Sequence, residues 1–250
     1  MEVGAITGYV DLAQLILYLF WLFFAGLIYY LVRENHREGY PMEPDGAGRG
    51  PVSGWPIPEP KTYKLEHGEV TIPDPAKREP AYSAVATGSA PGLPIEPTGD
   101  PMLAGVGAGA WAYRADVPDM TLHGEAKIRP LRAVEGYDVA AGDVDPRGLP
   151  VIGADGVQGG TVRDMWVDTA EMLFRYIEVD TGSRSVLLPV PFARIHRTSI
   201  EVNSIHGRHF AAVPGTKLPD QVTMLEEEKI AAYYGGGTLY ADPKRAEAWL

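Results

Sequence analysis

The chain has 250 residues, with 22 Lys and Arg against 33 Asp and Glu, so its formal net charge is −11 at pH 7. This length allows one or two domains, and the acidic balance argues against a nucleic-acid partner, which would require a basic face. The sequence has no cysteine, which excludes disulfides, thiolate metal sites and a cysteine nucleophile.

Residues 12–32 are predicted to form a transmembrane helix. They contain no charged side chain and one clearly polar one, Gln14. As a helix they span about 30 Å, the thickness of the hydrocarbon core of a bilayer. A secretory signal would need a basic start, which residues 1–11 lack, and a soluble core helix is rarely apolar on every face. Asp11 is the expected N-cap.

The basic residues predict the orientation of this helix. Every Lys and Arg follows residue 32, and Arg33 and Arg37 stand directly at its end. The positive-inside rule therefore places residues 1–11 outside and the bulk of the chain in the cytoplasm. At the membrane interface, Arg33 and Arg37 are expected to meet lipid phosphates, and Tyr29 and Tyr30 to lie in the headgroup belt.

Residues 33–110 are predicted to form an extended Pro/Gly-rich segment. Residues 41–101 hold 13 of the 22 prolines, which disfavours helices and central strands. One short strand is expected at residues 69–72. The segment is either a disordered tether or a strap lying on a partner, and interspersed apolar residues such as Trp55 and Tyr63 favour the strap.

Residues 111–250 are predicted to form a β domain. Short apolar or alternating runs are separated by turns such as Asp145–Gly148, a spacing typical of a small antiparallel barrel or sandwich. The expected strands are 149–152, 157–167, 174–179, 185–188, 192–196 and 200–205. Neither a GxGxxG motif nor a P-loop occurs, which argues against a nucleotide-binding α/β domain.

A helix is expected from Met224 to Tyr234. Thr223 and Glu226 form a capping-box pattern at its start, and Gly235–Gly237 is expected to end it. The three acids at 226–228 are interpreted as a solvated face. The nearby run His206-Gly207-Arg208-His209 could indicate a metal site, but without a cysteine a solvated loop is favoured.

Several motifs, in this order and spacing, resemble the H subunit of the purple-bacterial photosynthetic reaction centre, a PRC-barrel family. They are Arg37-Glu38-Gly39-Tyr40-Pro41, Pro60-Lys61-Thr62-Tyr63, Pro97-Thr98-Gly99-Asp100-Pro101, Asp145-Pro146-Arg147-Gly148-Leu149-Pro150-Val151, Gly160-Thr161-Val162 with Asp164, Trp166-Val167-Asp168, Ala232-Tyr233-Tyr234 and Leu239-Tyr240-Ala241. The resemblance implies one N-terminal transmembrane helix and a mainly β cytoplasmic domain built around a small antiparallel PRC-type barrel, with a short C-terminal helix.

The resemblance also implies a function. The chain would be a subunit, not an enzyme, in a bacterial inner (intracytoplasmic) membrane, with a periplasmic N-terminus. It would cap the cytoplasmic face of the L and M subunits, stabilise the complex, shield the secondary quinone and help deliver protons to it. The complex carries bacteriochlorophyll, bacteriopheophytin, quinones and a non-haem iron, none of them bound mainly by this chain. Membrane lipids, a core light-harvesting antenna and a cytochrome subunit are further expected partners.

The resemblance names candidates for a proton relay. Glu171 matches an acid near the quinone's proton path, Asp168 lies beside it, and Arg175 follows four residues later. His123 matches a histidine at the proposed point of proton uptake, where this chain has Glu125 instead of a frequent second histidine. Two alternatives stay open, because Asp168 can simply cap a turn, and Glu171 with Arg175 can be an exposed ion pair. No metal ligand is predicted.

A second hypothesis is a membrane-anchored β-barrel adaptor unrelated to photosynthesis. The strand pattern alone permits it, whereas the motifs in residues 37–101 and 223–241 argue against it. An anchored enzyme is disfavoured because the sequence shows no nucleophile–base pair, metal cluster or phosphate loop.

Overall fold

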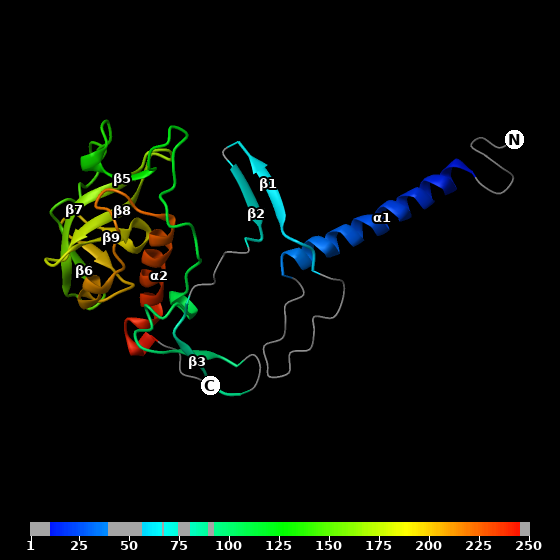
Figure 1. Ribbon diagram of the computed structural model, residues 1–250. Helices are drawn as coiled ribbons and strands as arrows, with labels where there is room; N and C mark the ends of the chain where they lie inside the picture. Colours follow the sequence, from blue (N-terminus) through cyan, green and yellow to red (C-terminus); the bar gives the residue numbers. More distant parts are fainter. Residues whose placement is uncertain (1–10, 40–56, 67, 75–80, 90–92, 246–250) are drawn as a thin grey trace. The chain divides into compact units, whose positions relative to one another are not determined.

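The computed structural model describes residues 11–39, 57–66, 68–74, 81–89 and 93–245. The chain divides into two compact units, Met1–Arg78 with Gly88–Leu93 and Glu79–Thr87 with Pro94–Leu250. The β3–β4 ribbon described below therefore belongs to the second unit, earlier than the sequence boundary at residue 111. Figure 1 shows the elements of both units.

Helix α1 (Leu12–Arg37) dominates the first unit. The carboxylate of Asp11 caps it by accepting a 2.7 Å hydrogen bond from the backbone N–H of Gln14, as expected. Among the described residues, α1 is the one helix long and apolar enough to cross a membrane, and its apolar stretch is exposed. The helix includes the predicted span 12–32 and continues through five more polar residues. It ends where Gly39 adopts a left-handed φ of 95°.

The proline-rich region contains two small antiparallel ribbons. In the first unit, β1 (Lys61–Leu65) pairs with β2 (Gly68–Ile72). In the second unit, β3 (Ala84–Ala86) pairs with β4 (Ile95–Pro97). Only β2 was expected from the sequence, and β1, β3 and β4 are further strands in the described part of this region.

The second unit is built on a curled seven-stranded sheet, which confirms the predicted fold class. Its strands are β5 (Ile128–Pro130), β6 (Pro150–Gly153), β7 (Gln158–Asp168), β8 (Leu173–Asp180), β9 (Ser185–Pro189), β10 (Ala193–Ile195) and β11 (Ile200–Val202). The order is β10-β11-β6-β7-β8-β9, and β5 also pairs with β7. One pairing differs from the expected antiparallel pattern, because β11 returns beside β6 in the parallel direction.

Strand β7 is the centre of this sheet. β6 pairs with its first half and β5 with its last three residues, while β8 pairs along the other edge. Register shifts at Val162/Asp164 and Trp166/Val167 let the long strand bend. The curl encloses a core that includes Trp166, Ile177 and Leu188, all less than 2 % exposed.

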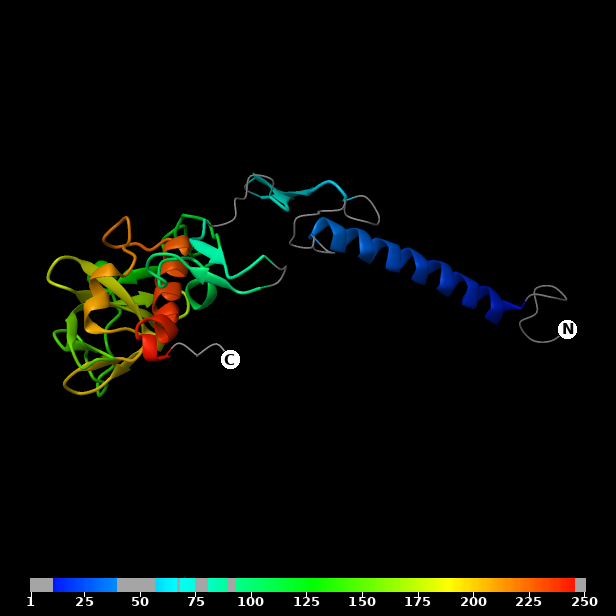
Figure 2. The same cartoon turned by 90° about the horizontal axis from the view of Figure 1, so that it is seen from below.

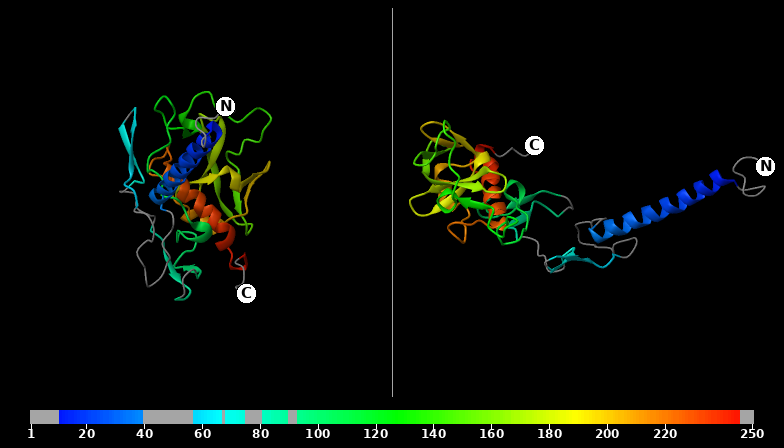
Figure 3. Two further views of the ribbon diagram at one scale, coloured as in Figure 1. Left: turned by 90° about the vertical axis from the view of Figure 1, so that its right-hand side faces the viewer. Right: turned by 90° about the horizontal axis from the view of Figure 1, so that it is seen from above.

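Helix α2 (Met224–Tyr240) packs against the curled sheet, as Figures 2 and 3 show. The prediction that it stops at Tyr234 was wrong, because the helix continues through the glycine run. A Cβ atom on Gly237 would lie 2.3 Å from Cγ2 of Ile205 and 2.7 Å from the carbonyl oxygen of Ser204. Gly237 therefore serves close packing and not helix termination.

The interpretation of the acids at 226–228 as a solvated face was also wrong. Glu226 is buried and completes the capping box with Thr223, and it also accepts a hydrogen bond from the backbone N–H of Lys217. Glu227 accepts a hydrogen bond from the hydroxyl of Tyr176. These contacts come from segments distant in the sequence, which a local charge pattern does not reveal.

Five 3₁₀ helices join these elements in the described chain. They are η1 (Gly107–Gly109), η2 (Leu131–Ala133), η3 (Val190–Phe192), η4 (Gly207–Ala212) and η5 (Pro243–Arg245). The expected solvated loop at His206–His209 is instead the capped start of η4, where the two imidazole rings stack 5.4 Å apart. Within the described ranges no group of three potential His, Cys, Asp or Glu metal ligands occurs.

Candidate functional site

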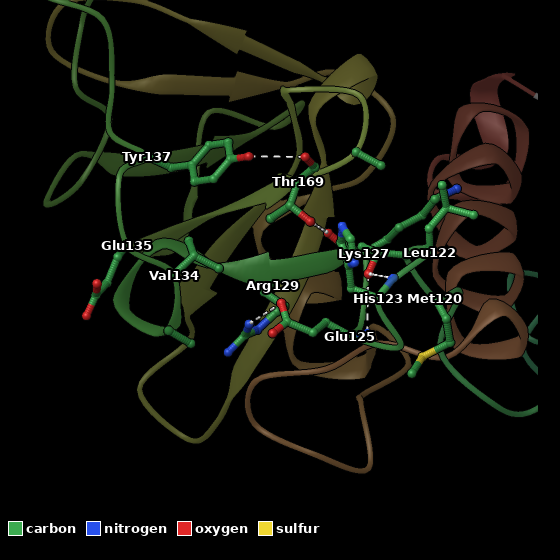
Figure 4. Close-up of a pocket in the computed structure, with 13 residues that line it drawn as sticks. Met120, Leu122, His123, Glu125, Lys127, Arg129, Val134, Glu135, Tyr137 and Thr169 are labelled. Carbon is green, nitrogen blue, oxygen red and sulfur yellow. Dashed lines mark hydrogen bonds and ion pairs between the residues drawn. The ribbon is translucent and has the colours of Figure 1, made fainter.

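A surface pocket of about 760 Å³ lies beside β5 in the second unit (Figure 4). The loop before β5 supplies one wall, and Thr169 and Ala170 of the β7–β8 turn supply another. Residues 133–137 complete the rim. The pocket thus joins the two chain segments in which the sequence-predicted relay residues lie.

The first wall presents His123 and Glu125 to solvent on a tight turn. The hydroxyl of Thr121 accepts hydrogen bonds from the backbone N–H groups of both residues, each at 3.3 Å. Gly124 between them adopts a φ of 79°, which a side chain would strain. The carboxylate of Glu125 lies 3.8 Å from the guanidinium of Arg129. Both candidates are therefore exposed lining residues of the pocket.

The second wall, the β7–β8 turn, is stabilised by Asp168, whose side chain is buried at 2 % exposure. Its Oδ1 accepts 3.0 Å hydrogen bonds from the backbone N–H groups of Ala170 and Glu171. Its Oδ2 lies 3.5 Å from Nε of Arg175. The alternative that Asp168 caps the turn is thus confirmed, and the buried carboxylate also faces a cation.

Glu171 and Arg175 form an ion pair of 2.7 Å, with side chains 50 % and 41 % exposed. The geometry matches the alternative of an exposed pair. Since Arg175 also faces Asp168, one guanidinium bridges the buried and the exposed carboxylate. Asp168, Glu171 and Arg175 therefore form one cluster behind the turn that borders the pocket.

Lys127 connects the two walls and was not selected from the sequence. Its carbonyl oxygen accepts hydrogen bonds from the backbone N–H of Thr169, at 2.9 Å, and from its hydroxyl, at 3.1 Å. Its ammonium group lies 2.8 Å from Asp119. That hydrogen bond raises the pKa of Lys127, and the charges of Asp168 and Glu171 raise it further. The adjacent pairing of Ile128 with Asp168 brings this lysine to the site.

The residues predicted for the membrane interface divide into two groups in the first unit. Tyr29 and Tyr30 are exposed, and the exposed Arg33 lies 5.9 Å from the ring centre of Tyr29. Arg37 is buried instead.

The partners of Arg37 all belong to the first unit. It donates a hydrogen bond to the carbonyl oxygen of Glu59 and pairs with Glu34. Lys61 also pairs with Glu34, at 2.8 Å. Arg37 therefore links residue 59 to the end of the helix, whereas Arg33 is exposed.

Comparison with known families gives two matches. A model of the photosynthetic reaction centre H-chain N-terminal region matches residues 4–133, which is more than half of the chain. A PRC-barrel domain model matches residues 139–209. The first match includes His123 and Glu125, and the second includes Asp168, Glu171 and Arg175. The pocket is accordingly formed by residues of both matched regions.

Proposed function

Because the chain belongs to the family of photosynthetic reaction centre H chains, we propose that it caps the cytoplasmic face of the L and M subunits, shields their secondary quinone and helps deliver protons to it. Membership makes the chain a structural subunit that associates with L and M and is membrane-associated through one helix. The alternative of an adaptor unrelated to photosynthesis is not retained, because the match extends well outside the barrel.

The proposed orientation has the N-terminus in the periplasm and the bulk in the cytoplasm of a bacterial inner (intracytoplasmic) membrane. The absence of Lys and Arg before residue 33 supports it through the positive-inside rule. In this complex, L and M carry the bacteriochlorophyll, bacteriopheophytin, quinones and non-haem iron. A core antenna, a cytochrome subunit and membrane lipids are the remaining proposed partners.

The observation that carries the proton-delivery proposal is the arrangement around the pocket. His123 and Glu125 are exposed on one wall, and Thr169 and Ala170, from the turn that also carries Asp168 and Glu171, form another. A pocket of this size, lined by polar as well as apolar side chains, has room for ordered water. Carboxylates and histidine joined by water can pass protons to a buried acceptor.

Each group has a proposed role. His123 and Glu125 collect protons from bulk water, and Glu171 passes them on. Asp168 receives hydrogen bonds that hold the turn, so it keeps the backbone of Glu171 in place. Arg175 forms ion pairs with both carboxylates. The carbonyl oxygen of Lys127 accepts a hydrogen bond from Thr169 and so links the loop before β5 to the β7–β8 turn.

The test is Glu171→Gln in the assembled, purified complex. The amide keeps the shape of the side chain but, unlike the carboxylate, cannot accept and release a proton. We expect proton uptake coupled to reduction of the secondary quinone to slow by on the order of tenfold or more. The first electron transfers within L and M should keep their rates.

Glu135→Gln is the matched control, because Glu135 lines the same pocket away from the β7–β8 turn. It should leave uptake unchanged. Normal proton uptake in the Glu171→Gln complex would rule out the relay role of Glu171. A preparation of the chain lacking pigmented L and M subunits would contradict the proposed assembly itself.

A further inference from the structure

A second, smaller cavity of about 230 Å³ lies in the second unit and shares no lining residue with the pocket beside β5. It is formed by the flanks of the β10–β11 pair and the last turns of α2. Its lining residues are Pro191 and Phe192 of η3, Arg194 of β10, Asn203 and Ser204 directly after β11, and Thr238 of α2. Pockets for drug-sized ligands measure about 300–1,000 Å³, so this cavity suits a small ligand or one group of a larger molecule.

Ser204, which lines this cavity, has an unsatisfied buried hydroxyl. The residue is 6 % exposed, and its Oγ has no hydrogen-bond partner among the described residues. Its backbone carbonyl oxygen is already occupied, because Arg245 donates a 3.1 Å hydrogen bond to it. A buried polar group without a partner costs free energy, and native proteins normally supply one. The Ser204 hydroxyl therefore indicates a bound molecule or ion.

Arg194 brings to the cavity a positive charge that pairs with no acid. It is exposed, and its guanidinium makes no ion pair or hydrogen bond within the described ranges. Glu201 lies opposite it in the β10–β11 register, but the Glu201 carboxylate is 3.4 Å from Nε2 of His196. The neighbouring guanidinium of Arg245 donates to two backbone carbonyl oxygens at the negative end of α2. Arg194 is therefore the cation that remains for a ligand.

The other lining residues add hydrogen-bond donors and one apolar wall. In the part of the chain that the structure describes, the Asn203 amide has no partner, and the Thr238 hydroxyl makes only a long, 3.5 Å contact with the carbonyl oxygen of Tyr234. The ring of Phe192 stacks on that of Tyr234, with their centres 5.7 Å apart. No lining residue is an acid. A guanidinium, an amide and two hydroxyls thus surround a space without negative side chains.

We infer that this cavity binds a phosphate group, carried either by inorganic phosphate or by the headgroup of a phospholipid. The guanidinium of Arg194 binds phosphate oxygens in a bidentate manner, and the amide and hydroxyl donors bind the remaining oxygens. A carboxylate has only two oxygens and would leave donors of this set unused. The inference goes beyond the proposed function and does not depend on it, since neither the pocket beside β5 nor proton delivery is involved.

Titration calorimetry on the detergent-solubilised full chain tests the inference. After dialysis into phosphate-free detergent, inorganic phosphate and short-chain phosphatidic acid are titrated separately, at constant ionic strength set with chloride. We expect saturable binding of at least one of them, and the tighter binder identifies the source of the phosphate group. Phospholipid phosphorus that stays with the dialysed wild-type chain and is lost from Arg194→Gln would count as headgroup binding.

Two arginine variants locate the binding. Arg194→Gln should weaken the affinity by on the order of tenfold or more, because it removes the charged partner of the phosphate. Arg197→Gln is the matched control, since Arg197 is exposed, lies three residues further along the chain and does not line the cavity. It should leave the affinity unchanged.

Ser204→Ala gives an independent measurement. It removes a hydroxyl that has no partner, so the thermal midpoint without phosphate should not fall, whereas the affinity should fall roughly threefold or more. Phosphate should raise the midpoint of the wild type by mass action and that of Arg194→Gln much less. Equal affinities of Arg194→Gln and Arg197→Gln, acetate binding as tight as phosphate binding, or no binding of phosphate in either form would overturn the inference.

Discussion

The hydroxyl of Tyr176 donates a 2.9 Å hydrogen bond to the carboxylate of Glu227 and so links β8 to the first turn of α2. Burial raises the pKa of Glu227 above its usual 4.5, although the Tyr176 hydrogen bond partly opposes this. Burial also raises the pKa of Tyr176, and the adjacent negative charge adds to that effect. The contact therefore joins the sheet to the helix through a carboxylate that folding shifts toward its protonated form.

Glu227→Gln should alter the pH dependence of stability. A carboxyl whose pKa is raised by folding stabilises the folded chain below its unfolded pKa, near 4.5. That contribution is lost as pH rises through the higher folded pKa. The difference in unfolding free energy, variant minus wild type, should therefore become more positive from pH 4 to pH 7. Denaturant unfolding of the detergent-solubilised full chain measures it, and a pH-independent difference would contradict the assignment.

Tyr176→Phe should strengthen the pH dependence of stability that Glu227→Gln removes. It removes the hydrogen bond that lowers the pKa of Glu227 and leaves the burial that raises it. The loss of stability between pH 4 and pH 7 should then be larger than in the wild type. In the double variant with Glu227→Gln, this extra pH dependence should disappear.

The glycine run of α2 gives a prediction about packing. Gly237→Ala should destabilise the second unit by roughly 2 kcal/mol or more, because its Cβ would overlap Ile205 and the Ser204 backbone. Gly235→Ala is the control, since its Cβ would meet the Ala108 carbonyl oxygen at 3.4 Å and little else. Alanine favours the helix by about 1 kcal/mol, so this variant should be neutral or slightly stabilising. Thermal unfolding that ranks the two variants equally would contradict the close-packing role.

These glycines show what the sequence could and could not predict. The apolar run 12–32 and a long strand at 157–167, observed as Gln158–Asp168, were predicted because their patterns report burial directly. Gly235–Gly237 was misinterpreted because a helix stop and a close packing contact require the same residue. Local sequence cannot separate these two uses, since the deciding neighbour, Ile205, comes from a distant segment.

The candidate site likewise contains residues that the sequence indicated and one that it did not. Asp168, Glu171 and Arg175 were selected together, and their mutual contacts are local. Lys127 was missed because its role depends on the pairing of Ile128 with Asp168, forty residues apart. Long-range register of this kind follows from the assembled sheet, and a single sequence does not display it.

Two variants of Asp168 separate turn capping from proton transfer. Asp168→Ala removes the acceptor of two backbone N–H groups and should cost about 1–3 kcal/mol of stability. Asp168→Asn keeps a side-chain oxygen at that position and should cost less. If Asp168 also takes part in the relay, both variants slow proton uptake. If it only caps the turn, uptake in Asp168→Asn remains normal while stability follows the predicted order.

Arg132 holds two buried acids of the sheet together. Its Nη1 lies 3.0 Å from Asp164 and 2.5 Å from Glu178, whose exposed fractions are 5 % and 3 %. Glu178 also accepts a 2.9 Å hydrogen bond from the indole N–H of Trp166. Arg132→Met would leave two buried carboxylates without their main cation, so the second unit should lose roughly 3–5 kcal/mol.

Arg147→Met is the matched control for Arg132→Met. Arg147 pairs with Asp138 and Asp145, whose side chains are largely or partly exposed, and such surface pairs contribute about 0–1 kcal/mol. Denaturant midpoints of the two full-length variants make the comparison. Similar losses in both would mean that Arg163, 3.5 Å from Glu178, compensates the buried charge by itself. A much larger loss for Arg132→Met would identify Arg132 as the cation on which this buried cluster depends.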